Sequence, residues 1–237
     1  NSVIAGAGND GITLGWGKDW VYAGKGDDTI DAGGGNNLLA FNKGDGNDTV
    51  IHANWNDETV SLGGGILLGD IQLAKAGSHL IIKLGADQSI TLKDWYVSAQ
   101  YQGLNRLQVV TIDSADYQSG ATDALHNRPV VVLDFKQLVQ AFDAARAASS
   151  QAEAGWTPSA THLSTAQVQG SWSASQQQAY LNPWIALQRH VDEADDLPIP
   201  TPAELAAQAP TAAQAWLVSV MGASQAAPDV GVGWMFG

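Results

Sequence analysis

The 237-residue sequence contains no cysteine. The chain therefore has no disulfide bond, no thiolate metal ligand and no cysteine nucleophile. If the protein works outside the cell, its fold must be stabilised by something other than disulfides.

Basic residues are also scarce: 11 Lys and Arg stand against 24 Asp and Glu, and the formal net charge is −13. A chain this acidic, with its few basic residues scattered, is a poor match for nucleic acid or for an anionic membrane surface. No run of 18 apolar residues is present, so we expect no membrane-spanning segment. The chain opens on Asn1 rather than Met, which suggests a piece of a longer or processed protein. It shows no signal-peptide pattern, which leaves open export by a route that cuts no N-terminal signal.

The usual catalytic motifs are missing as well. The histidines are far apart, at positions 52, 79, 126, 162 and 190, and the sequence contains no H-E-x-x-H and no G-x-S-x-G motif. The acidic pair Asp195-Asp196 is typical of a solvated helix end. We therefore predict that the chain is not an enzyme; the alternative is a catalytic domain hidden in residues 120–237, to which no motif points.

Glycine and aspartate, by contrast, are abundant, with 26 Gly and with 20 Asp against 4 Glu. A merely solvated acidic surface would use both acids. Short, turn-forming Asp suits loops that aim carboxylates at a cation.

The N-terminal stretch VIAGAGNDGI (3–12) matches the G-x-G-x-x-G pattern of dinucleotide-binding loops. It is, however, the first copy of a nine-residue repeat. The five blocks are AGAGNDGIT (5–13), LGWGKDWVY (14–22), AGKGDDTID (23–31), AGGGNNLLA (32–40) and KGDGNDTVI (43–51). A dinucleotide-binding loop must run into a helix, and the glycines of the later blocks exclude one here.

Each block has Gly at its second and fourth positions, Asp or Asn at its sixth and an apolar residue at its eighth. Glycines allow positive φ and bring carbonyl oxygens close together, and the acidic residue adds negative charge at a fixed offset. The candidate metal-binding residues are therefore Gly6, Gly8, Asp10, Gly15, Gly17, Asp19, Gly24, Gly26, Asp28, Gly33, Gly35, Asn37, Gly44, Gly46 and Asp48.

These blocks resemble the nonapeptide G-G-x-G-x-D-x-U-x of RTX (repeats-in-toxin) proteins. The sequence departs from that pattern at the first position of each block and at Asn37, where the pattern has Asp. The resemblance implies a parallel β-roll in which six residues form a calcium-binding turn and three form a short strand whose middle residue points inward. Alternate blocks then share ions, so we expect calcium sites between Asp10 and Asp28, between Asp28 and Asp48, and a weaker one between Asp19 and Asn37. In the alternative interpretation these side chains only cap turns.

The middle of the chain changes to alternating strands. They are expected at DETVSL (57–62), DIQLA (70–74), SHLIIKL (78–84) and QSITLKDWY (88–96). With FNKGDGNDTV (41–50), this stretch resembles the haemolysin-type calcium-binding-related domain that often follows RTX repeats. The resemblance implies a β cap that seals one end of the roll. The Asp-Gly pair that commonly ends this family is missing from LQVVTIDSADY (107–117).

Beyond Asn127 the sequence becomes rich in Ala and Gln. DFKQLVQAFDAARAA (134–148) predicts an amphipathic helix with Asp134 as N-cap and Gln137 three residues on. Further helices are expected to start at Ser164, near Pro183, at Thr201 and at Thr211. The predicted divisions are 1–51 for the β-roll, 52–120 for the β cap and 121–237 for a mainly α-helical region. RTX proteins typically carry an uncleaved C-terminal type I secretion signal, and the position of this last region fits that role.

Three aromatic residues lie in the second block, LGWGKDWVY (14–22). Trp16 is expected at a turn tip, whereas Trp20 and Tyr22 flank the inward Val21 and are expected to face outward. Exposed aromatics at these positions would offer a surface for a saccharide or a neighbouring copy. In the alternative, the helical region or the β cap folds over them.

Taken together, the sequence predicts a non-catalytic, calcium-dependent folding and secretion module at the C-terminus of a bacterial type I-secreted RTX protein. Its partners would be calcium ions and the type I secretion machinery, and its location extracellular or at the cell surface. The alternative is a calcium-driven, self-assembling structural protein of a surface layer, extracellular fibre or adhesin.

Overall fold

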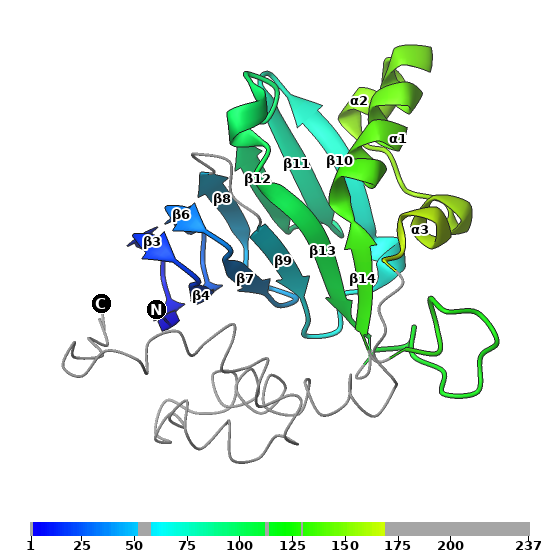
Figure 1. The fold of residues 1–237 in the computed structure, drawn as a ribbon, viewed down its shortest axis with the longest axis horizontal. Helices are drawn as coiled ribbons and strands as arrows, with labels where there is room; N and C mark the ends of the chain where they lie inside the picture. Colours follow the sequence, from blue (N-terminus) through cyan, green and yellow to red (C-terminus); the bar gives the residue numbers. More distant parts are fainter. Residues whose placement is uncertain (1, 52–57, 112–113, 129, 169–237) are drawn as a thin grey trace.

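The computed structural model describes residues 2–51, 58–111, 114–128 and 130–168 (Figure 1). This part of the chain is mostly β-structure, and α-helices appear only towards its end. The prediction of a β-rich N-terminal part followed by helices is therefore confirmed for the described residues.

Short strands separated by glycine-containing corners make up the N-terminal part. They are β1 (Ser2–Ala7), β2 (Gly11–Thr13), β3 (Trp16–Gly17), β4 (Trp20–Lys25), β5 (Thr29–Asp31), β6 (Gly34–Gly35), β7 (Leu38–Phe41) and β8 (Asn47–Ile51). We call residues 2–17, 20–35 and 38–51 the first, second and third windings, because each contributes one strand to each of two sheets.

In-register parallel pairing stacks these windings on one another. Strand β1 pairs with β4 and β4 with β7, and on the other side β2 pairs with β5 and β5 with β8. Partners in the first two windings are 18 residues apart, as in Val3 with Val21 and Ile12 with Ile30. Two nine-residue blocks therefore make one winding, and each block's corner lies beside the corner two blocks later.

The middle of the chain extends both sheets. It contains β9 (Glu58–Leu62), β10 (Ile71–Ala76), β11 (His79–Leu84), β12 (Ser89–Lys93), β13 (Leu104–Val110) and β14 (Val130–Asp134), with short 3-10 helices at Leu68–Asp70 and Ala99–Tyr101. One six-stranded sheet has the order β1-β4-β7-β9-β13-β14 and the other β10-β11-β12-β8-β5-β2, while β3 and β6 form a small third sheet. The pairing is parallel along the windings and becomes antiparallel in β10–β11–β12 and in β13–β14.

Three helices lie beside the antiparallel ends of the sheets (Figure 1). Helix α1 (Phe135–Ala148) contacts β13 and β14, α2 (Gln151–Ala154) contacts β10, and α3 (Ala160–Ala166) contacts β14. Within the described residues, no helix is long and apolar enough to cross a membrane.

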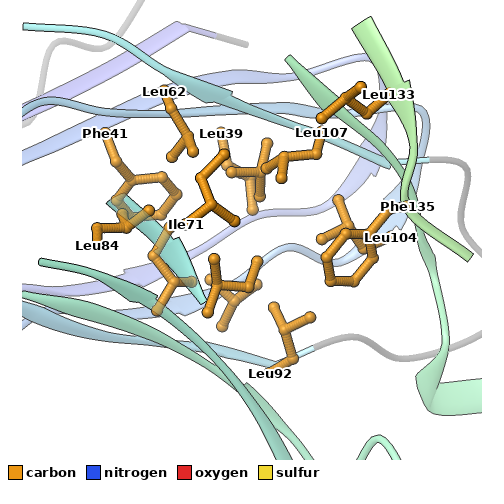
Figure 2. Close-up of a cluster of buried hydrophobic side chains, with 14 of the residues drawn as sticks. Leu39, Phe41, Leu62, Ile71, Leu84, Leu92, Leu104, Leu107, Leu133 and Phe135 are labelled. Atoms are coloured by element: carbon orange, nitrogen blue, oxygen red, sulfur yellow. The ribbon is translucent and has the colours of Figure 1, made fainter. Parts of the chain in front are cut away.

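One hydrophobic cluster runs between the two large sheets and under α1. Figure 2 shows Leu39 and Leu62 of one sheet facing Ile71 and Leu92 of the other. The eighth residues of the five blocks, predicted to point inward, are all buried: Ile12, Val21, Ile30, Leu39 and Val50. Burying these side chains is what the repeat contributes to the core.

The predicted secondary structure agrees with much of this arrangement. The four expected strands between residues 57 and 96 correspond to β9, β10, β11 and β12. The side chain of Asp134 accepts a hydrogen bond from the Gln137 N–H, as predicted for the N-cap of α1. The helix predicted to start at Ser164 is wrong, because α3 has its N-cap at Ser159 and ends at Ala166.

Strand β14 was not predicted. Its apolar, β-branched run, Val130–Leu133, directly precedes the α1 N-cap and could have indicated it. The helices expected near Pro183, at Thr201 and at Thr211 lie outside the described residues.

Candidate metal centre

Three predicted acidic residues form a column along one corner of the stacked windings. Asp10, Asp28 and Asp48 immediately precede or lie in β2, β5 and β8, and parallel pairing places them side by side. The Asp10 N–H donates to Oδ1 of Asp28 at 2.8 Å, and the Asp28 N–H donates to Oδ1 of Asp48 at 3.0 Å. One oxygen of Asp28 and one of Asp48 thus cap the preceding winding, as the turn-capping interpretation requires.

The second oxygen of each carboxylate has no such role. Oδ2 of Asp10, of Asp28 and of Asp48 is buried and has no hydrogen-bond partner among the described residues. Asp28 and Asp48 are each only 1% exposed, so bulk water does not solvate these oxygens. Leaving a buried acceptor unsatisfied costs about 1–3 kcal/mol, and more when the acceptor is charged. Turn capping therefore accounts for only one of the two carboxylate oxygens of Asp28 and of Asp48.

The raised pKa values of Asp28 and Asp48 also indicate that this column favours a bound positive charge. Burial raises the pKa of Asp48 to about 7; the Asp28 N–H opposes this rise and the nearby carboxylates of Asp28, Asp45 and Asp27 add to it. Burial likewise raises the pKa of Asp28, against the Asp10 N–H and together with the charges of Asp10 and Asp27. Stacked, buried like charges disfavour the ionised state of each member. A cation would remove this penalty.

A second column runs beside the first on the solvent side. The Asp27 N–H donates to Oδ1 of Asn9 at 2.9 Å, the Asn47 N–H donates to Oδ1 of Asp27 at 2.8 Å, and the Ser89 hydroxyl donates to Oδ1 of Asn47 at 2.9 Å. These hydrogen bonds run in the opposite sense to those of the Asp10 column. The role of the fifth block position was missed from the sequence, although Asn or Asp precedes the sixth residue in four of the five blocks.

The predicted glycines lie at the corners, and all except Gly15 have positive φ. Gly24 also shows how closely the windings approach, because a Cβ built on it would lie 1.7 Å from the carbonyl oxygen of Gly6. At Gly35 the corresponding distance to the carbonyl oxygen of Gly17 would be 1.6 Å. Backbone carbonyls of one winding therefore lie against the glycines of the next, a contact that any side chain would prevent.

The opposite corner carries the weaker predicted pair. The Asp19 N–H donates to Oδ1 of Asn37 at 3.0 Å, and the Asn37 carbonyl accepts from the Thr59 N–H at 2.9 Å. Parallel pairing of β7 with β9 brings Glu58 next to Asn37, and Glu58 is fully buried. Glu58 was not among the predicted site residues, since the segment before it does not follow the glycine pattern. It nevertheless stands two residues before the inward Val60, as Asp28 stands before Ile30.

The three predicted pairs are thus adjacent, but no compact cluster of metal-binding side chains accompanies them. Among the residues that the structure describes, no three His, Cys, Asp or Glu side chains group together as a metal centre. A metal ion at these corners would need backbone carbonyl oxygens in addition to the carboxylates.

The aromatic surface predicted from the sequence is present only in part. Trp16 is 81% exposed in β3, as expected for a turn tip. The prediction that Trp20 and Tyr22 face outward to solvent is wrong, because they are 3% and 1% exposed. The Tyr22 hydroxyl contacts Oδ1 of Asp45 at 3.3 Å and Nδ2 of Asn42 at 3.2 Å, in the corner that carries the two-residue insertion. The alternation of side chains along β4 predicted which residues point to the side opposite Val21. It did not predict that this side of the strand is also buried.

Comparison with known proteins adds no family assignment. Neither a protein-family model nor a curated protein matches the sequence. The resemblance to RTX proteins therefore rests on sequence patterns alone, namely the nine-residue repeat and the stretch between residues 41 and 96.

Proposed function

We propose that the windings form a parallel β-roll that binds calcium, and that the chain is a non-catalytic, calcium-dependent folding and secretion module of a secreted bacterial RTX protein. One observation carries this proposal. Three stacked carboxylates each keep one buried oxygen without a hydrogen-bond partner.

The residues present fit calcium. Calcium takes six to eight oxygen ligands in flexible geometry and accepts carboxylates and backbone carbonyls together. In this proposal Asp10, Asp28 and Asp48 supply the carboxylates, and the corner glycines supply carbonyl oxygens. The bound ion would supply the positive charge that compensates the buried carboxylates. Asp19 and Asn37 would hold a weaker site, since an amide contributes no charge.

The energetic effect is large enough to control folding. Extracellular calcium modules have Kd values of roughly 10⁻⁴–10⁻³ M. An ion held at ten times its Kd stabilises the folded state by about 1.4 kcal/mol, and two or three such ions by about 3–4 kcal/mol. This is a substantial share of the net stability of a small domain, which is about 5–15 kcal/mol.

This calcium dependence suits a protein that must cross a secretion channel unfolded. The chain would stay unfolded where free calcium is scarce, pass through the type I machinery, and fold outside the cell. If the protein works outside the cell, bound ions would take the place of the disulfides that a chain without cysteine cannot form.

A calcium titration of the chelated protein, followed by circular dichroism, tests the proposal. We expect β-structure signal to appear with calcium and not with equal magnesium, which prefers a rigid octahedral shell and loses its water reluctantly. If magnesium and calcium act equally, or if the chelated protein keeps its full β signal in chelator at neutral pH, calcium-dependent folding is excluded.

The variant Asp28→Asn/Asp48→Asn separates metal binding from turn capping. Asn37 already caps Asp19 through its amide oxygen, at the same 3.0 Å as the carboxylate of Asp48 caps Asp28. Asn at positions 28 and 48 should therefore keep the caps and lose the charge. We expect the calcium midpoint to rise at least about tenfold, which corresponds to about 1.4 kcal/mol. Asp87→Asn, on an exposed turn, is the matched control and should leave the midpoint unchanged.

A further inference from the structure

The corner of the third winding differs from the corresponding corner of the second. We call residues 42–48 the insertion corner, because the two-residue insertion Phe41-Asn42 separates this block from the one before it. In the second winding, a Cβ on Gly24 would lie 1.7 Å from the Gly6 carbonyl oxygen. Gly44 stands at the same block position, yet a Cβ on it would meet no atom of the described residues within 4 Å. The preceding winding therefore does not pack against Gly44.

A side chain from the turn between β11 and β12 contacts Gly44 instead. Oε1 of Gln88 accepts a hydrogen bond from the Gly44 N–H at 2.9 Å. Nε2 of the same side chain donates to the Asn42 carbonyl at 2.6 Å. One amide group thus bonds to the backbone on both sides of Lys43. Gln88 is only 6% exposed, so bulk water competes little for these hydrogen bonds.

The β11–β12 hairpin brings Gln88 to this position. The Gln88 carbonyl accepts from the Leu84 N–H at 2.9 Å, which closes the turn of the hairpin. The next residue, Ser89, begins β12, which lies beside β8 in parallel pairing (Figure 1). The Ser89 N–H donates to the Gly46 carbonyl at 3.2 Å, and its hydroxyl donates to Oδ1 of Asn47 at 2.9 Å. Four hydrogen bonds of two consecutive residues therefore join the hairpin to the insertion corner.

On its other side, the insertion corner is bonded to the second winding. The Gly26 N–H donates to the Asp45 carbonyl at 2.6 Å, and the Asp28 N–H donates to Oδ1 of Asp48 at 3.0 Å. The insertion itself is fixed within the corner, because the Asn42 N–H donates to Oδ2 of Asp45 at 2.5 Å. The insertion corner thus lies between the β11–β12 hairpin and the winding that shares the proposed Asp28 and Asp48 calcium site.

We infer that Gln88 is a positioning residue for the calcium site of Asp28 and Asp48, and that it couples calcium binding at this corner to the folded β11–β12 hairpin. The inference rests on the proposed function. Gln88 does not bind the ion; it fixes the turn that contributes Asp48 and the neighbouring carbonyl oxygens. The two-residue insertion, which breaks the nine-residue rhythm, supplies the Asn42 carbonyl to which Gln88 donates.

The backbone of the insertion corner explains why its conformation must be fixed. Gly44 and Gly46 have φ of +91° and +118°, and glycine loses more conformational entropy on folding than any other residue. A Cβ on Gly46 would lie 2.2 Å from the Gly26 carbonyl oxygen, so the second winding restrains Gly46. Gly44 has no such contact and depends on Gln88.

Calcium needs six to eight oxygen ligands, more than two carboxylates supply, so backbone carbonyls of the corner must take part. A turn that already has the binding conformation loses less entropy when the ion binds, and the affinity is higher.

The coupling acts in both directions. The folded hairpin keeps the insertion corner in the conformation that binds the ion, and the bound ion keeps it in the conformation that receives Gln88. Two events that favour the same conformation of one segment favour each other by the same free energy. Calcium bound between Asp28 and Asp48 therefore promotes closure of the β11–β12 hairpin, although the hairpin supplies no ligand.

Gln88→Met tests the inference in the full chain. Methionine is similar in length but makes neither hydrogen bond, so Gly44 loses its contact. The matched control is Gln108→Met, because Gln108 is also 6% exposed and its Nε2 donates to Oγ of Ser61 in β9 at 3.0 Å, outside the corners. Calcium titration of the chelated variants, followed by circular dichroism, gives the midpoints. We expect the midpoint of Gln88→Met to exceed that of Gln108→Met by about tenfold or more.

A second readout separates positioning from a general loss of stability. Terbium replaces calcium as the probe, and its luminescence decays faster when more water molecules coordinate it. A carbonyl oxygen that no longer points at the ion is replaced by water. In saturating terbium, with circular dichroism showing both variants folded, Gln88→Met should therefore decay faster than the wild type. Gln108→Met should decay at the wild-type rate.

Hydrogen exchange in the wild-type chain tests the coupling without any substitution, so it decides the question if Gln88→Met does not fold. The Gly44 amide should open with the same free energy as the amides of β12. Both should gain the same protection as the calcium concentration rises, because they belong to one cooperative unit.

Three outcomes would overturn the inference: a midpoint for Gln88→Met no higher than that of Gln108→Met, a wild-type terbium decay in Gln88→Met, or exchange of Gly44 independent of β12. A wild-type chain that does not respond to calcium would overturn the proposed function and this inference together. A wild type that responds, with Gln88→Met behaving like its control, contradicts this inference alone.

Discussion

Asp28 and Asp48 lie 20 residues apart in the sequence, yet the backbone N–H of Asp28 donates a 3.0 Å hydrogen bond to Oδ1 of Asp48. This hydrogen bond joins two windings and brings two buried carboxylates together in one column. Oδ2 of each remains without a hydrogen-bond partner. Keeping these buried, neighbouring carboxylates ionised therefore costs electrostatic free energy. Binding of a proton or a cation lowers that cost.

The first prediction concerns pH in the absence of metal. The pKa of Asp48 is about 7 in the folded state against an ordinary value of 3.8, so the folded chain holds a proton that the unfolded chain has released. The resulting stabilisation is complete below the unfolded pKa and is lost as pH rises through the folded one. The free energy of unfolding in chelator should therefore fall between about pH 4 and pH 7. Urea unfolding at a series of pH values measures it; where the chelated protein is unfolded at neutral pH, acidification should restore β signal.

Asp48→Asn is the variant that checks the assignment. It keeps the hydrogen-bond acceptor for the Asp28 N–H and removes the titrating group, so the fall with pH should become shallower. Asp87→Asn should keep the wild-type slope. Identical slopes for wild type and Asp48→Asn would show that other groups govern the pH dependence.

The second prediction concerns the closest contact between windings. Gly24→Ala adds a Cβ 1.7 Å from the Gly6 carbonyl oxygen, at a residue with φ of +100°. It should lower the free energy of unfolding by at least about 3 kcal/mol, because the backbone conformation is strained and two windings must separate. The measurement is chemical denaturation in saturating calcium.

Alanine variants at two other glycines distinguish the cost of backbone strain from the cost of a steric clash between windings. Gly8 has φ of +122° with open space around it, so Gly8→Ala should cost about 1 kcal/mol through backbone strain alone. Gly11 has neither positive φ nor a close neighbour, and Gly11→Ala should be nearly neutral. A loss at Gly24 no larger than that at Gly8 would mean that the windings are not packed as tightly as described.

The third prediction concerns the buried tyrosine of the second winding. Tyr22→Phe removes the hydroxyl that donates to Asp45 and accepts from Asn42, both of which are buried. The loss of these contacts should destabilise the fold by about 1–3 kcal/mol. Trp16→Ala should change stability by less than about 0.5 kcal/mol, because the indole is 81% exposed. Thermal unfolding of both variants in calcium makes the comparison, and equal losses would contradict it.

Much of the arrangement follows from short-range pattern. The nine-residue rhythm, with the RTX resemblance that it carries, predicted which side chains enter the core, since the eighth positions are buried, and which pairs of acidic corners become neighbours. The N-cap at Asp134 and the start of α1 were also readable, because capping depends on a few consecutive residues. Helix α3 shows the limit of such signals: Ser164 looked like an N-cap, but Ser159 begins the helix and Gln167 bonds to β14 instead.

By itself, then, the sequence determined the periodic features: the repeat, the corner glycines, the inward apolar residues and the acidic columns, because each depends on spacing within one or two blocks. Only the tertiary structure decided that Trp20 and Tyr22 are covered and that Glu58 continues the Asp19 and Asn37 corner. These features depend on which distant segments pack against a strand. The burial of the outer face of β4 and the pairing of β9 with β7 depend on contacts with distant segments, which no local pattern encodes.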